Sequence, residues 1–272
     1  MRFAHISLLV LPLSLVLAGC PRDKNSEPFT SAEAQEALDE SNGASAADSL
    51  ESASIEIATN FTIGSALEAA AGEVRSFVQS ELPCAEIALQ GATLTVDYGV
   101  NPGSCSYRGQ QFTGSHAITL AANAMSEVKV HHEWTGFSNG VVMLDGHADV
   151  TWDFAAKSRH VVHHAEWTHL KSGRTGIGDG DRTQRPLAAG LAQGIEVVGT
   201  RSWTGARGQW ELAIDGVQMR WADPVPQAGS YTLVTPNDKT ISLGFARVDE
   251  DTIAVTLTGP KGRSFTFDVT KL

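Results

Sequence analysis

The pattern of apolar and polar side chains changes at about residue 86 of this chain. From there on, apolar residues recur at every second position, as in strands with one covered face. Turn-forming pairs such as Asn139-Gly140, Asp145-Gly146 and Asp215-Gly216 separate these segments. The alternation is clearest in Leu94/Val96/Tyr98, Val128/Val130/His132/Trp134, Ile241/Leu243/Phe245, Ile253/Val255/Leu257 and Phe265/Phe267/Val269. The predicted fold class is mainly β, a large antiparallel meander that forms a sandwich or a partly open barrel.

One segment ahead of these strands has a helical period. Its apolar residues recur at spacings of three and four, Ser65 and Glu68 have the spacing of a capping box, and Pro83 ends the pattern. The apolar stripe consists of Leu67, Ala70, Ala71, Val74, Phe77 and Val78. We therefore expect an amphipathic helix over 65–82 that packs on the sheet.

The segment 20–52 has a different composition. It is rich in Ala, Ser, Glu and Asp and nearly free of large apolar side chains. It can therefore bury too little apolar surface to compensate for the conformational entropy that it would lose on folding. Thr30 and Glu33 have capping-box spacing, which predicts at most a transient helix over 31–40. The expected domain organisation is a signal peptide at 1–19, a flexible acidic tether at 20–52 and a single β domain at 53–272.

The N-terminus carries the most specific motif. Arg2 precedes an apolar run that ends in Leu17-Ala18-Gly19-Cys20, the pattern of a short secretory signal. Leu-Ala-Gly-Cys resembles the lipobox of bacterial lipoproteins. The resemblance implies removal of residues 1–19 and attachment of fatty acyl chains, such as palmitate, to Cys20. It further implies a cell-envelope protein anchored in a bacterial membrane, the outer rather than the inner, with its domain facing the periplasm or the cell surface.

Net charge narrows the range of partners. The chain carries a formal charge of −11, and residues 21–56 contain nine acidic and two basic side chains. Without a basic stripe, nucleic acid is excluded as a partner. The negative net charge of the chain also opposes adsorption to anionic lipid. The acyl chains on Cys20 are therefore the expected contact with the membrane.

Cys84 and Cys105 are the two remaining cysteines. In an exported protein the simplest expectation is a disulfide between them. A metal-binding or catalytic thiol is the alternative, although the chain has no Cys-x-x-Cys motif and no basic residue beside Cys84.

Histidine is concentrated in one region, with seven of nine residues between 131 and 169. Strand geometry sends adjacent side chains to opposite faces, so His132 and His163 should point inward with the tryptophans. The outward histidines His131, His160 and His164 are then weak candidates for a metal site. Histidines that fill the sheet and bond locally are the simpler interpretation.

All six tryptophans lie between 134 and 221. This part of the chain therefore holds either the bulkiest core or a ligand surface, for which Trp134, Trp167 and Trp203 are weak candidates. The core is the favoured interpretation.

Two further patterns have ordinary explanations. Gly136, Ser138 and Gly140 match Gly-x-Ser-x-Gly, but Asn139-Gly140 predicts a hairpin turn instead of a nucleophile elbow. The glycine-rich segment 173–185 is expected to be a long polar hairpin, with a calcium loop as the alternative. No nucleotide motif is present, and we expect no cofactor.

These patterns favour a membrane-anchored envelope lipoprotein whose β domain is a non-enzymatic binding or scaffold module for an unknown protein. A carrier of a lipid or other hydrophobic ligand is the alternative, and a metal-dependent enzyme at the histidine cluster is a further one. A carrier requires a hollow apolar interior, whereas a scaffold requires a filled interior. A metal-dependent enzyme requires at least three His, Asp or Glu side chains that converge in a cleft.

Overall fold

The computed structural model describes residues 29–271. Thirteen strands form one antiparallel sheet in which sequence neighbours pair, and β3 and β4 form a separate two-stranded hairpin. The strands are β1 Glu86–Gln90, β2 Thr93–Tyr98, β3 Ser106–Tyr107, β4 Gln110–Gln111, β5 Thr113–Ala124, β6 Glu127–Ser138, β7 Val142–Asp153, β8 Ser158–His169, β9 Thr175–Pro186, β10 Ile195–Gly205, β11 Gly208–Met219, β12 Ala228–Val234, β13 Thr240–Arg247, β14 Thr252–Thr258 and β15 Ser264–Thr270. The predicted mainly β meander is confirmed. It is one curved sheet that does not close into a barrel.

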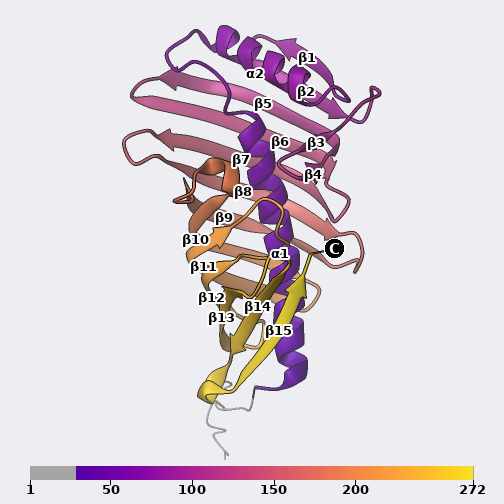
Figure 1. Ribbon diagram of the computed structural model, residues 1–272, viewed down its shortest axis with the longest axis vertical. Coiled ribbons are helices and arrows are strands. Elements are labelled where there is room, and N and C mark those ends of the chain that lie inside the picture. Colours follow the sequence, from indigo (N-terminus) through magenta and orange to yellow (C-terminus); the bar gives the residue numbers. More distant parts are fainter. Residues whose placement is uncertain (1–28, 272) are drawn as a thin grey trace, which may run out of the picture.

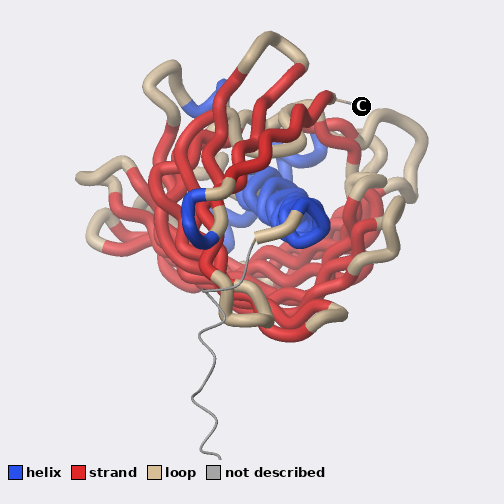
Figure 2. The backbone as a smooth tube through the Cα atoms, turned by 90° about the horizontal axis from the view of Figure 1, so that it is seen from below, coloured by secondary structure: helices blue, strands red, loops and turns tan. Residues whose placement is uncertain are grey.

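A long helix, α1 (Ser31–Ile57), lies inside the curve of this sheet (Figure 2). Figure 1 shows that α1 runs across the strands, from the β13–β15 end toward the β5–β6 end. The capping box predicted at its start is present, since the Glu33 amide donates to Thr30 Oγ1 at 3.2 Å and the Thr30 amide donates to the Glu33 carboxylate at 2.9 Å. The sheet therefore surrounds a helix of its own chain.

The prediction of a flexible tether was wrong for residues 31–52. They belong to α1, in which 19 side chains are buried, most of them Ala, Ser, Asp and Glu. Because these side chains are small, the sheet approaches the helix backbone closely, and because the acids meet basic partners, their burial is tolerated. The folded body already includes Phe29, which is buried and packs edge-on against Phe265. The predicted signal peptide at 1–19 and the predicted lipidation site, Cys20, lie outside the described residues.

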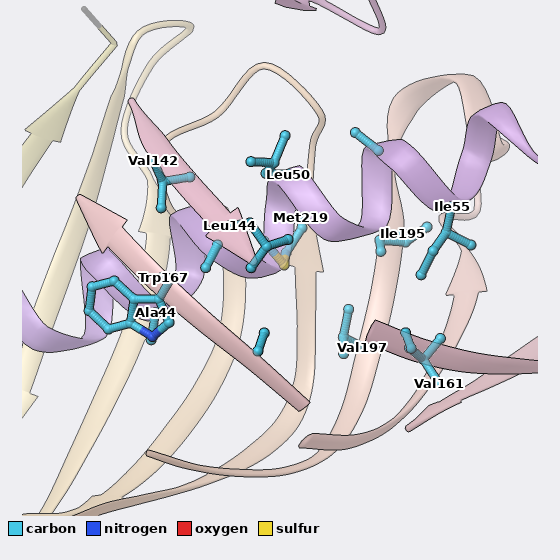
Figure 3. Close-up of a cluster of buried hydrophobic side chains, with 14 of the residues drawn as sticks. Ala44, Leu50, Ile55, Val142, Leu144, Val161, Trp167, Ile195, Val197 and Met219 are labelled. Atoms are coloured by element: carbon cyan, nitrogen blue, oxygen red, sulfur yellow. The ribbon is translucent and has the colours of Figure 1, made fainter. Parts of the chain in front are cut away.

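The core lies between α1 and the inner face of the sheet. Figure 3 shows Leu50 and Ile55 of the helix among side chains of the strands, including Leu144 of β7 and Val161 of β8. Burying apolar surface on this scale is the main favourable contribution to folding. The interior is thus filled by protein side chains along α1.

A second helix, α2 (Leu67–Glu81), confirms the helix predicted over 65–82. It buries Ala70, Ala71, Val74 and Val78 and lies against β1, β2 and β5. The predicted Ser65 cap was wrong, because the N-cap is Ala66, without a side-chain hydrogen bond, and the Ser65 hydroxyl instead donates to the carbonyl of Thr62.

Cys84 and Cys105 lie at disulfide distance, with their Cα atoms 5.3 Å apart. The predicted pair is therefore present. It ties the end of α2 to the chain just ahead of β3.

The glycine-rich segment 173–185 is mostly a strand, β9, in the middle of the sheet, so the expected polar hairpin was wrong. Its glycines make room for large side chains of β8. A Cβ atom at Gly176 would lie 2.6 Å from the indole of Trp167, and one at Gly180 would lie 2.2 Å from the ring of His163. Aromatic rings that cover cross-strand glycines explain a strand that buries no apolar side chain of its own, since Ile177 is exposed.

Two of the predicted turns lie inside strands instead. Asn139-Gly140 does connect β6 to β7, but Asp145-Gly146 lies within β7 and Asp215-Gly216 within β11. Both pairs stand beside a shift in strand register. Gly146 and Gly216 have φ of 140° and 57°, conformations that suit glycine at a bulge and bend the sheet around α1.

Candidate functional site

The three candidate tryptophans face α1. Trp134 donates from Nε1 to Ser54 Oγ at 3.0 Å, Trp203 donates to Glu40 Oε2 at 3.3 Å, and Trp167 packs against Gly43. None of the three is more than 2% exposed. The favoured interpretation, a bulky core, is therefore correct for these three residues, and the alternative of a ligand surface is wrong.

The inner face of the sheet also carries a row of buried arginines that pair with acids of α1. Three guanidinium groups from β8, β9 and β10 meet three helical carboxylates, so the formal charges balance. The pairs are Arg182 with Asp48 at 2.7 Å and with Glu51 at 2.6 Å, Arg201 with Asp48, and Arg159 with Glu56. These contacts fix the rotation and axial position of the helix, because acids at three positions along α1 meet arginines of three neighbouring strands.

The N-terminal part of α1 is held by a further, more exposed set of charges. Arg174 bonds Glu36 at 3.0 Å and Glu40 at 2.7 Å, and Lys239 bonds Glu33 at 2.6 Å. The hydrogen bond from Arg174 lowers the pKa of Glu36, and Lys239 helps lower that of Glu33 against the effect of burial. Ion pairs therefore continue along most of the helix.

Asp48, Glu51 and His163 offer three ligand atoms within 4.8 Å of one another, the one such group among residues 29–271. Arg182 already occupies the space between them, because its guanidinium bonds both carboxylates and donates to His163 Nδ1 at 2.8 Å. Burial and Arg182 lower the pKa of His163, whereas burial raises the pKa of Glu51. A neutral imidazole beside a guanidinium does not fit a cation site, and all three residues are buried.

His116 of β5 and His132 of β6 form a second buried pair. Their rings stack with centroids 5.2 Å apart, and His116 Nε2 lies 2.9 Å from His132 Nδ1. Burial lowers the pKa of His116 to about 3, and burial together with His116 lowers that of His132 well below its usual range. Two neutral rings can share one proton in a hydrogen bond, so the pair satisfies its polar atoms within the core.

The candidate metal residues His131, His160 and His164 lie on the outer face of the sheet, as predicted, while His132 and His163 are buried. Each outer histidine contacts an aspartate, but the structure does not bring the three to one point. The contacts join His131 Nδ1 to Asp149 at 2.9 Å, His160 Nε2 to Asp181 at 2.6 Å and His164 Nδ1 to Asp179 at 2.8 Å.

A groove of about 580 Å³ opens where the sheet leaves one side of α1 uncovered. We call it the seam groove. Its lining includes Asn42, Ala46 and Ser49 of α1 together with Gln110, Asn139, His169, Lys171, Trp221, Val269 and Lys271. Apolar patches with a few amide, amine and imidazole groups are typical of ligand pockets of this size.

The sequence patterns above did not predict the acids and arginines that pair in the interior. Glu33, Glu36 and Glu40 recur at helical spacing and continue to Asp48 and Glu51, an acidic stripe that could have indicated a helix facing basic partners. On the strands, Arg182 and Arg201 occupy inward positions by alternation, which was the corresponding signal.

Comparisons with protein-family models, curated proteins and solved structures give no match to this chain. Within residues 29–271, no helix combines the length and apolar character needed to cross a membrane. Ser138 of the Gly-x-Ser-x-Gly pattern lies at a hairpin, where its hydroxyl donates to the Val142 carbonyl at 2.8 Å. This is a structural turn, as its sequence indicated.

Proposed function

We propose that this protein is a lipid-anchored envelope lipoprotein whose β body is a non-enzymatic binding or scaffold module. The observation that carries the proposal is the filled interior, in which α1 occupies the whole curve of the sheet and its acids pair with Arg159, Arg182 and Arg201. A partner must then contact the outside of the body, and the seam groove of about 580 Å³ offers a concave surface for that contact.

The same interior argues against a lipid carrier. Displacing α1 would uncover the buried Arg159, Arg182 and Arg201, and acyl chains would leave these three charges without the helical carboxylates that pair with them. A carrier of hydrophobic ligands requires an interior lined by apolar side chains instead.

The anchor is tested by replacing Cys20. We expect a Cys20→Ala chain to leave the particulate fraction, because the acyl chains are the proposed attachment to the membrane. A variant that stays in that fraction as the parent does would contradict the anchor. Native mass spectrometry of the released chain should show no bound lipid, and a stoichiometric lipid adduct would favour the carrier.

The binding role is tested with a photo-crosslinking amino acid. Placed at Lys171 in the seam groove, it should capture a defined envelope component in cells, whereas the same group at Lys157, in the β7–β8 turn, should not. Equal capture from both positions, or none from either, would argue against a groove-directed partner.

A further inference from the structure

Three histidines form a ladder across the outer face of β6, β7 and β8. His131, His147 and His164 stand on successive strands, with ring centroids 5.8 Å apart for the first pair and 6.0 Å for the second. His147 and His164 are direct cross-strand partners in the register. We define these three residues as the histidine ladder.

The two outer rings of the ladder are oriented by carboxylates. His131 and His164 each contact an aspartate through Nδ1, at 2.9 and 2.8 Å. A carboxylate oxygen accepts, so Nδ1 carries the proton and the Nε2 lone pair remains available. Metal-binding histidines are commonly held in this way, with a carboxylate on the nitrogen that does not bind the metal.

The ring nitrogens of the central residue, His147, are available to a ligand. His147 makes no hydrogen bond to any residue that the structure describes, and its ring touches both neighbours. Glu133 stands opposite it in the register of β6 and β7. Carboxylates on three sides of the ladder therefore make this part of the surface attractive to a cation.

The ring spacing fits shared coordination. With metal–nitrogen bonds of about 2.0–2.1 Å, two imidazoles on one tetrahedral ion have centroids about 5–6 Å apart. Both spacings measured in the ladder lie at the upper end of this range. Small rotations of the half-exposed outer rings would bring their Nε2 atoms toward an ion on His147.

We propose that the histidine ladder binds one divalent transition-metal ion, with His147 as the common ligand and Nε2 of His164 or His131 beside it. Imidazole favours ions such as Zn²⁺ and Cu²⁺ over Mg²⁺ and Ca²⁺, and water completes the coordination on this open face. His160 does not take part, because its Nε2 contacts Asp181 at 2.6 Å, away from the row of ladder rings.

The test is calorimetric titration of Zn²⁺ into the full chain carrying Cys20→Ala, which removes the one cysteine outside the disulfide. We expect one Zn²⁺ per chain. His147→Gln should weaken binding at least about tenfold, and His131→Gln or His164→Gln should each weaken it less. His160→Gln is the matched control, an outer-face histidine with its own aspartate, and should bind as the parent does.

Two results would overturn the proposal. One is equal Zn²⁺ affinity in the parent and in His147→Gln, and the other is loss of binding in His160→Gln as large as in His147→Gln. As a second readout, sub-stoichiometric Cu²⁺ should broaden the NMR signals of the ladder imidazoles before those of His160. Thermal unfolding of each variant without metal checks that the fold is intact.

Discussion

Trp167 of β8 lies directly against Gly43 of α1, with no room between them for a further carbon atom. A Cβ at position 43 would come within 2.8 Å of two ring carbons of Trp167, and that indole is itself 2% exposed and covers Gly176. The glycine in the helix and the tryptophan in the sheet therefore determine how closely α1 approaches the strands.

Gly43→Ala should destabilise the protein by about 1–3 kcal/mol, because the added methyl overpacks a rigid contact. Intrinsic helix propensity alone predicts the opposite sign. Gly72 of α2 provides the matched control, since nothing lies within 4 Å of a Cβ there. Gly72→Ala should stabilise by about 0.5–1 kcal/mol. Urea unfolding measures both, and a stabilising Gly43→Ala would contradict the close packing of α1.

Arg182→Met should destabilise by about 3–5 kcal/mol, because it leaves Glu51 buried without its cation and leaves Asp48 with Arg201 alone. Arg207→Met is the control. Arg207 also pairs with an acid of α1, Glu36 at 3.2 Å, but its side chain is 69% exposed, and the loss should stay under about 1 kcal/mol. Similar losses in the two variants, measured by denaturant unfolding, would show that burial does not decide the strength of these pairs.

Acidification should destabilise the protein through its buried histidines. The pKa of His116 falls from 6.5 to about 3 on folding, so the unfolded chain takes up the proton first as the pH drops. The stability contribution is complete above pH 6.5 and is lost progressively down to the folded value, about 2 kcal/mol by pH 5. His132 and His163 shift in the same direction.

The measurement is the free energy of unfolding in urea at pH 7.5 and pH 5. NMR of the His116 ring supplies the control, since it should remain neutral over this whole range. A His116 ring that titrates between these pH values would contradict its burial as the cause.

The Cys84–Cys105 bond should leave no reactive thiol in the denatured, unreduced Cys20→Ala chain, and two after reduction. Mass spectrometry after alkylation counts them. The sequence separation of 21 predicts a loss of about 3 kcal/mol in unfolding free energy on reduction. Two alkylated cysteines before reduction would refute the bond, and the Cys84→Ala/Cys105→Ala double variant should match the reduced chain.

Local patterns determined much of the fold. Period-2 alternation in segments such as Val128–Trp134 gave the strands, and it also placed His132 inward and His131 outward, because side-chain direction along a strand depends only on neighbouring residues. The apolar stripe of α2 was predictable for the same reason, whereas the Cys84–Cys105 pair was predictable because these are the two cysteines that remain besides Cys20. The glycine-rich strand β9 was not predictable, because its glycines are covered by Trp167 and His163 of another strand.

The sequence by itself determined the antiparallel meander, the second helix and the faces of the histidines. Only the tertiary structure decided that residues 31–57 are a buried helix, since a helix without an apolar stripe is stable only against complementary arginines supplied by strands more than 100 residues away. It also decided which histidines become neighbours. His147 lies next to His131 and His164 because of the register in which the three strands pair, and the spacing of these residues along the sequence does not reveal that register.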